Sequence, residues 1–304
     1  MFKKKLLSVV LLSMATLGIV GCSGSDDSNE NETSVVDLTK GEYKQKILIE
    51  DITSASCMWC PLATVAIDGL EKSEYKDVVI GVGAHGDFNA NMVKDPFVIP
   101  GLSDLQKAVK QNGSWPFVAF NRNTGIKGTA FQSFLNQTAS GVFEVSASKF
   151  ETFQKNNKLI NDGSPIGIKI ASNLGATSGK VDVSLKFSQS INQDLKYVVY
   201  ILEDGLVFRQ ANATAMYGNN TGEPAWSTNF VHDHVIRATN NFLGEAVPAD
   251  QTKTTSEFTA TANLTYQIED LAKTSVVVAV LDSKGNVLNA QKAKGNTTQD
   301  YQKK

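Results

Sequence analysis

The cysteine pair Cys57 and Cys60, separated by Met58 and Trp59, is the feature of this sequence with the clearest chemistry. Two thiols at this spacing can form a disulfide, exchange it with thiols of another protein, or supply two ligands of a zinc ion. Zinc needs two further ligands, and the sequence has no second cysteine pair, because its only other cysteine is Cys22. Thiol–disulfide exchange and a purely structural disulfide therefore remain as alternatives.

The segments around this CxxC alternate between predicted strands and predicted helices. Continuous apolar runs indicate buried strands, whereas apolar residues at intervals of three and four indicate helices. The predicted elements are, in chain order, a strand at 46–53, a helix from the CxxC to 70, a strand at 78–84, a helix at 103–112 and a strand that opens at 115–120. This order resembles the thioredoxin fold. A CxxC at a helix start suits redox chemistry, because the helix N-terminus stabilises a thiolate.

The thioredoxin resemblance implies roles for both cysteines and for one proline. Cys57 is expected to attack, as the cysteine nearer to the helix N-terminus and the more exposed one, and Cys60 to resolve the mixed disulfide. In thioredoxins the loop proline that faces the CxxC is cis, and Pro116 resembles it. A proline is also simply tolerated at the start of a strand, so Pro116 alone does not decide between the alternatives.

A buried carboxylate in the strand before the CxxC, thought to handle protons, is a further thioredoxin feature. Asp51 matches it by its distance from Cys57, and Glu50 matches it by its position after the apolar run 47–49. Successive residues of a strand point to opposite faces, so at most one of the two can serve. The alternative is that both are ordinary polar residues at the end of a strand. The catalytic candidates are Cys57, Cys60, Pro116, Asp51 and Glu50.

From about residue 164 the pattern changes to strict alternation of apolar and polar residues, separated by turn residues. This pattern predicts an all-β, Ig-like sandwich of about seven strands at 161–304, after an α/β thioredoxin-like domain at 45–160. We expect the first domain to fold on its own. A polar loop at 211–229 leads to His232 and His234, which would share one strand face. We predict no metal there, because a third ligand is not evident.

The N-terminus has the features of an export signal. Basic residues at 3–5 precede an apolar stretch at 6–20, which ends in Gly21 and Cys22. This resembles the bacterial lipobox, which predicts a signal peptide at 1–21, a lipid on Cys22 and an acidic tether at 22–44. The alternative for Cys22 is a chance cysteine behind an ordinary signal. The acidic residues after Cys22 are either a plain spacer or a surface-export signal.

Composition restricts the partners. The hydrophobic fraction is 41% and the net charge is −2, and no basic run follows the signal. These values are ordinary for a globular protein and argue against nucleic-acid binding. The expected partners are a membrane, contacted through the lipid, and protein thiols or disulfides. We expect no cofactor.

Several short motifs together resemble the Omp28-related outer-membrane lipoproteins. The motifs are Leu48-Ile49-Glu50-Asp51, Cys57-x-x-Cys60-Pro61, His85-Gly86-Asp87-Phe88 and His232-x-His234-Val235-x-Arg237. The resemblance implies an outer-membrane location, on the periplasmic face or the cell surface, with a thioredoxin-like N-terminal half and a β-rich C-terminal half. It brings no defined reaction, because fold analogy does not settle function. A thiol–disulfide oxidoreductase and a non-catalytic surface binding protein with a structural disulfide are the two hypotheses.

Overall fold

The computed structural model describes residues 37–217 and 226–304. The predicted signal peptide and the lipidated Cys22 lie outside the described residues. Residues 36–304 group into one compact unit. No helix of the described part is long and apolar enough to cross a membrane.

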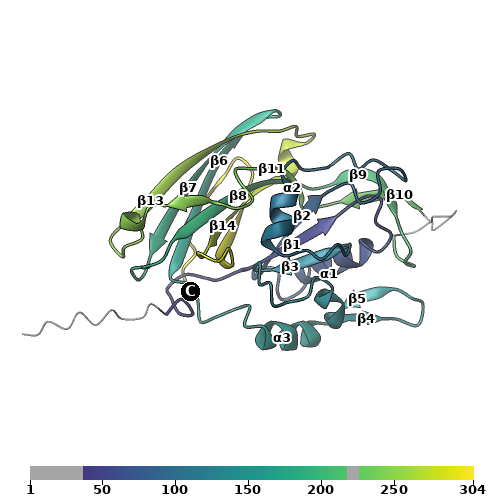
Figure 1. The fold of residues 1–304 in the computed structure, drawn as a ribbon, viewed down its shortest axis with the longest axis horizontal. Coiled ribbons are helices and arrows are strands. Elements are labelled where there is room, and N and C mark those ends of the chain that lie inside the picture. Colours follow the sequence, from purple (N-terminus) through teal and green to yellow (C-terminus); the bar gives the residue numbers. More distant parts are fainter. Residues whose placement is uncertain (1–36, 218–225) are drawn as a thin grey trace, which may run out of the picture. The chain divides into compact units, whose positions relative to one another are not determined.

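The chain is rich in β-structure, with few helices (Figure 1). The strands are β1 (Ile47–Thr53), β2 (Val79–His85), β3 (Phe117–Phe120), β4 (Leu135–Gln137), β5 (Phe143–Val145), β6 (Ile166–Leu174), β7 (Ser178–Phe187), β8 (Leu195–Glu203), β9 (Leu206–Ala211), β10 (Trp226–His232), β11 (Val235–Thr239), β12 (Glu245–Val247), β13 (Glu257–Thr265), β14 (Thr274–Leu281), β15 (Val287–Lys294) and β16 (Thr298–Gln299). The helices are α1 (Pro61–Glu71), α2 (Leu102–Ala108) and α3 (Ala147–Asn156), with 3-10 turns η1 (Ala130–Phe134), η2 (Ala249–Gln251) and η3 (Leu271–Lys273).

An eight-stranded sheet forms the centre, in the order β15-β14-β8-β11-β2-β1-β3, with β12 added beside β8. β1 and β2 are parallel and are joined through α1, and β3 runs antiparallel to β1. β11 pairs with β2 on one side and with β8 on the other. Strand, CxxC, helix, strand, helix and proline-initiated strand thus follow one another in the expected order.

Each face of this sheet has its own cover. One face carries a continuous apolar core from β1 to β15, which α2 covers with Leu105 and with Val109 just beyond its end. On the other face, α1, η1 and α3 pack over β1, β2 and β3. At the far end of that face, a second sheet of four strands, β13-β7-β6-β16, packs over β8 and β14 (Figure 1).

The expected sandwich is present as two packed sheets, but it does not stand apart from the first half. The sheet that contains β8 and β14 continues through β11 into β2, β1 and β3. The expected boundary at 160/161 therefore does not divide the core, and the C-terminal layer is not a free-standing Ig-like domain. The physical reason is the edge of β2, whose backbone groups need a partner and find it in β11.

Candidate functional site

The two cysteines of the CxxC form a disulfide. Helix α1 begins directly after them, because Cys60 is its N-cap and Pro61 its first residue, where a proline breaks no helical hydrogen bond. Cys57 and Cys60 are 2% and 1% exposed, whereas Met58 and Trp59 between them are 36% and 51% exposed. Both cysteines are buried, so exposure does not distinguish Cys57, and the expectation that Cys57 lies nearer to the helix start is wrong, because Cys60 is the N-cap.

A segment of the C-terminal half covers the loop that leads into the CxxC. The hydrogen bonds run from Gln210 Nε2 to the carbonyl oxygens of Ser54 (3.0 Å) and Cys57 (2.8 Å), from the Ala211 N–H to the Ala55 oxygen (2.8 Å) and from the Ala213 N–H to the Met58 oxygen (2.9 Å). Because β9 and the residues behind it bind the backbone of this loop, the C-terminal half fixes the position of the disulfide.

An apolar groove of about 580 Å³ opens on another side of the CxxC. Its lining is uncharged and consists of Trp59, Leu62, Trp115, Pro116, Thr129, Gln132, Leu135, Gln137 and Phe143. The Trp115–Pro116 peptide bond is cis, as the resemblance implied. The structure therefore brings Pro116 into one groove with the residues that flank Cys60.

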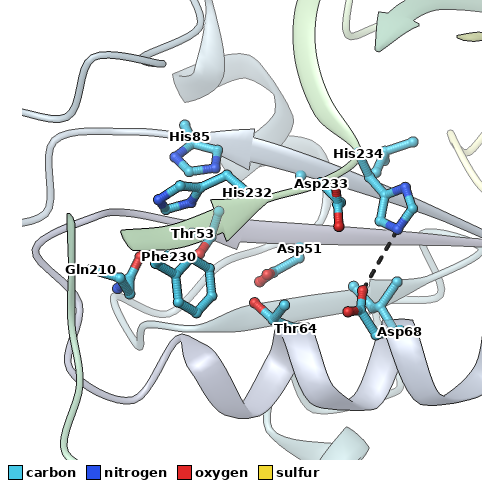
Figure 2. A pocket seen from close by; sticks show the side chains of 13 residues that line it. Asp51, Thr53, Thr64, Asp68, His85, Gln210, Phe230, His232, Asp233 and His234 are labelled. Atoms are coloured by element: carbon cyan, nitrogen blue, oxygen red, sulfur yellow. Dashed lines mark ion pairs between the residues drawn. The ribbon is translucent and has the colours of Figure 1, made fainter. Parts of the chain in front are cut away.

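Asp51 lies under α1, on the face of β1 that the helix covers (Figure 2). It is 4% exposed, and its Oδ1 is buried without a hydrogen-bond partner. Burial raises the pKa of Asp51 well above its usual range, because the charged form loses its hydration. A small cavity separates the strand from the helix here, and Thr64, one turn after Cys60, lines it as well. Asp51 is therefore a buried carboxyl beneath the start of the CxxC helix, at a place that favours its protonated form.

Glu50 points to the opposite face and is bound there. Arg122 donates to its carboxylate through Nε and Nη2, at 2.8 Å for the shortest contact. The Tyr200 hydroxyl donates to Glu50 Oε1 at 2.7 Å, and Arg122 also donates to the Phe242 carbonyl oxygen at 2.6 Å. The Glu50 carboxylate and the Tyr200 ring raise the pKa of Arg122 against the effect of burial. Of the two carboxylates, Glu50 joins the two halves of the chain and Asp51 faces the CxxC helix.

His85, at the end of β2, lies close behind the loop before Cys57. Its Nδ1 is 2.8 Å from Asp95 Oδ2, which also accepts a hydrogen bond from the Ala55 N–H at 2.7 Å. Burial opposes ionisation of Asp95, but the hydrogen bonds from His85 and from backbone N–H groups hold the pKa of Asp95 below its usual value. The rings of Phe97 and His232 pack edge-on against His85.

The expectation that His232 and His234 share a strand face is wrong. β10 ends at His232, β11 begins at Val235, and His234 lies in the turn between them with a positive φ of 58°. The two strands belong to different sheets, so His232 and His234 do not lie on one face of a single strand. Among residues 37–217 and 226–304, no group of three His, Cys, Asp or Glu side chains is arranged to hold a metal ion.

His234 instead joins the turn to α1. Its ring lies 3.3 Å from Glu71, 3.8 Å from Asp68 and 3.3 Å from Asp204. Burial by itself would lower the pKa of His234, but the three carboxylates outweigh it and raise the pKa to about 9. His232 has no carboxylate this close, and burial lowers its pKa to about 3. One histidine of the motif is thus a cation and the other a neutral imidazole.

Gln210, Asp95 and Arg122 are site residues that the sequence did not suggest. Gln210 contacts the CxxC loop across 153 positions of the chain, and Arg122 reaches Glu50 across 72. No local pattern reports contacts of that length. The short spacing of His85 and Asp95 could have drawn attention, because an imidazole and a carboxylate ten positions apart can meet across a single loop.

Comparisons with known proteins address the family. The family Outer membrane protein Omp28 matches residues 105–299, a segment that begins after the CxxC. Among solved structures, HBP35 of Porphyromonas gingivalis is similar with a TM-score of 0.59 and 18% identity, over 84% of this chain and 77% of that chain. At this identity the likeness concerns the fold alone.

Two further comparisons add no argument. A β-glucosidase from Kluyveromyces marxianus aligns with a TM-score of only 0.20 and 13% identity, over 58% of this chain and 20% of that chain. No curated protein matches the sequence. The family match covers well over half of the chain, and the expected resemblance is confirmed at this level. The chain therefore belongs to the Omp28 family of outer membrane proteins.

Proposed function

We propose that this outer membrane protein exchanges thiols and disulfides with other envelope proteins through a thioredoxin-like module at 45–160. The β-sandwich at 161–304 covers and positions that module. The observation that carries the proposal is the disulfide Cys57–Cys60 directly before α1, beside a groove that contains Trp59 and Pro116. A helix N-terminus next to a cysteine pair favours the thiolate that exchange requires.

Cys57 and Cys60 have distinct parts in this exchange. In the direction that oxidises a client, a client thiolate attacks the Cys57 sulfur, and the Cys57–Cys60 bond breaks as the mixed disulfide forms. Cys60 leaves as a thiolate and takes up the proton that Asp51 carries. A second client thiolate then attacks the client sulfur of the mixed disulfide, which releases Cys57 as a thiolate and the client as a disulfide. The reverse sequence reduces a client.

Asp51 is the better of the two carboxylate candidates for the proton. Burial raises its pKa and so favours the protonated carboxyl, which is the form that a general acid needs. Glu50 is held by Arg122 on the other face of the strand, and its carboxylate serves as an anchor. The uncharged lining of the Pro116 groove favours an extended, apolar segment of an unfolded client.

The proposed location follows from the predicted lipid on Cys22. Acyl chains on this residue would hold the protein on the outer membrane at about 0.8 kcal/mol per buried methylene. We expect Cys22→Ala to move the protein from the membrane fraction to the soluble envelope fraction. Mass spectrometry that finds an unmodified N-terminus at another residue would contradict the lipid anchor.

A non-catalytic binding protein is the second candidate, and one observation favours it. Both cysteines are buried, and the segment at 210–213 is hydrogen-bonded to the loop that carries them. In this alternative the disulfide is structural, and the β-sandwich binds a surface partner.

The reduction potential of Cys57–Cys60 separates the two candidates. We expect the full chain, equilibrated with glutathione buffers, to show a potential above roughly −300 mV, the range of exchangeable disulfides. A value far below it marks a structural bond. In cells, Cys60→Ser should trap mixed disulfides with clients, because the resolving thiol is missing, while the matched variant Cys57→Ser should trap none. Equal absence of trapped clients in both would favour the binding protein.

A further inference from the structure

The proposed exchange leaves the buried imidazole of His232 without a role. This side chain comes from the C-terminal half and lines the same cavity under α1 as Asp51 (Figure 2). The cavity has a volume of about 30 Å³, which is room for a water molecule and for little else. Whatever His232 does here must therefore involve water or the hydroxyl groups of the cavity wall.

Asp51 and His232 each bring to this cavity a buried polar atom that lacks a hydrogen-bond partner, and the chemistry of these two atoms is complementary. Asp51 Oδ1 and His232 Nε2 are both buried without a hydrogen bond. Burial favours the protonated form of Asp51, and a protonated carboxyl has an O–H to donate. The His232 ring is neutral and hydrogen-bonded to the backbone of Phe208, which leaves Nε2 as the nitrogen with a free lone pair. One partner needs an acceptor and the other a donor.

Thr53 supplies the intermediate position. It follows Asp51 by two residues on β1, so both side chains point to the same face. Thr53 pairs in register with His85, whose ring is 5.2 Å from that of His232, measured between centroids. Figure 2 shows the Thr53 hydroxyl between His232 and Asp51, at the wall of the cavity. A hydroxyl can accept one hydrogen bond and donate another, so it can link a donor on one side to an acceptor on the other.

We propose that Asp51 donates a hydrogen bond across this cavity, through water and the Thr53 hydroxyl, to the lone pair of His232 Nε2. His232 thereby acts as a positioning residue that holds the proton of Asp51 in place. The role in catalysis rests on the proposed exchange function, whereas the contact itself does not. In this arrangement the C-terminal half completes the proton site of the N-terminal half.

Nitrogen NMR of the full-length, histidine-labelled protein in its oxidised state tests the contact directly. The resonance of Nε2 reports whether its lone pair accepts a hydrogen bond. In the wild type we expect the chemical shift of a nitrogen that accepts a hydrogen bond. In Asp51→Leu the Nε2 chemical shift should move toward that of a free lone pair. In Asp51→Asn it should return to the wild-type value, because the amide again donates. An Nε2 resonance that is unchanged in Asp51→Leu overturns the proposal.

Two further variants separate the water path from general packing. A Cβ at Gly83 would meet no atom closer than 3.5 Å, so Gly83→Ala fits into the cavity and displaces water without a clash. It should move the Nε2 resonance as Asp51→Leu does. Phe97→Leu loosens the packing against the His232 ring but leaves the cavity lining intact, and should not move it. A shift in Phe97→Leu with none in Gly83→Ala would overturn the proposal in favour of packing.

The pH dependence of disulfide reduction then tests the catalytic part. We expect the profile of His232→Phe to differ from that of the wild type, whereas that of Phe97→Leu should not. A wild type without exchange activity would overturn the exchange function and leave the NMR result to decide the contact. Exchange activity with an identical profile in His232→Phe would overturn the positioning role.

Discussion

Glu50 and Asp51 are adjacent carboxylates with opposite environments. Glu50 meets Arg122 and Tyr200 within hydrogen-bond distance, so a buried cation lies beside this carboxyl. Asp51 has no cation beside it, and burial is the cause of its raised pKa. The strand alternation that separates them is visible in the sequence, but the partner that distinguishes them, Arg122, is not.

Asp51 should lower the stability of the protein at neutral pH. Its pKa in the folded state lies well above its ordinary value of 3.8. Above that value the unfolded chain gains by ionising while the folded chain does not, so stability falls as the pH rises toward the folded pKa. We expect Asp51→Asn to be more stable than the wild type at pH 7 and equally stable near pH 3, as measured by urea unfolding of the oxidised protein. A variant less stable at pH 7 would show that the fold stabilises the ionised carboxylate of Asp51, against the raised pKa.

Glu50→Gln should lower the stability of the protein by a large amount. The substitution leaves the Arg122 charge buried without its counter-ion, and such losses cost about 3–5 kcal/mol. Both side chains are about 1% exposed, so water cannot replace the lost partner. Glu151→Gln is the matched control, because it breaks the exposed pair with Lys155 and should leave the unfolding midpoint unchanged. Equal midpoints for both variants would contradict this role of Glu50.

At the scale of the elements, α1 is held between the cavity and an ionic cluster. Asp68 and Glu71 on the helix meet His234 from the β10–β11 turn, and Lys292 of β15 lies 3.9 Å from Glu71. The cluster fixes the last turns of the helix, while the disulfide and Gln210 fix its start. The helix that carries the cysteines is therefore attached to the C-terminal half at both ends.

His234→Gln should weaken this attachment in a pH-dependent way. The pKa of His234 rises from 6.5 to about 9 on folding, so its stabilisation is fully present below pH 6.5 and is lost as the pH rises through 9. The contribution is at most about 3 kcal/mol. We expect the variant to be less stable than the wild type at pH 6 and to approach it at pH 10, in chemical denaturation at both values. A difference that grows with pH would rule out the cationic form.

The sequence predicted the elements near the CxxC because their signals are local. The strand at 46–53, the helix behind the cysteines and the strand at 78–84 each follow from a short apolar pattern, and the structure places β1, α1 and β2 there. The His232–His234 turn was missed because Val231 and Val235 on either side continue an alternating pattern, as one strand would. Only the pairing of β10 and β11 with different sheets reveals the break.

At the scale of the whole molecule, the shared sheet is what the sequence could not predict. The contact between β2 and β11 joins Gly83 to Val235, and no local pattern reports a pairing over such a distance. The change from mixed to alternating pattern near residue 164 is real, and β6 begins at Ile166. It marks a change in local structure, however, and the core continues across it.

Because the two halves share this sheet, we now expect that residues 45–160 do not fold on their own. The fragment would leave the β2 edge unpaired and would lack the part of the apolar core that β8 and β14 contribute beside β1 and β2. Exposed edges and apolar faces promote aggregation. We expect the fragment to show no dispersed amide NMR spectrum, whereas residues 37–304 should give one. A well-dispersed spectrum of the fragment would restore two independent domains.

The contacts of Gln210 with the CxxC loop can form only after Gln210 has been synthesised. Gln210 is made 153 residues after Cys57, and at synthesis rates of about 5–20 residues per second this is a delay of roughly 8 to 30 s. During that interval the nascent cysteines are open from every side. Once Gln210 and the residues behind it bind the loop, one side of the CxxC is covered, and the Pro116 groove lies open beside Trp59. An oxidant that makes the first disulfide can thus meet a chain in which this cover has not yet formed, while later partners meet the covered loop.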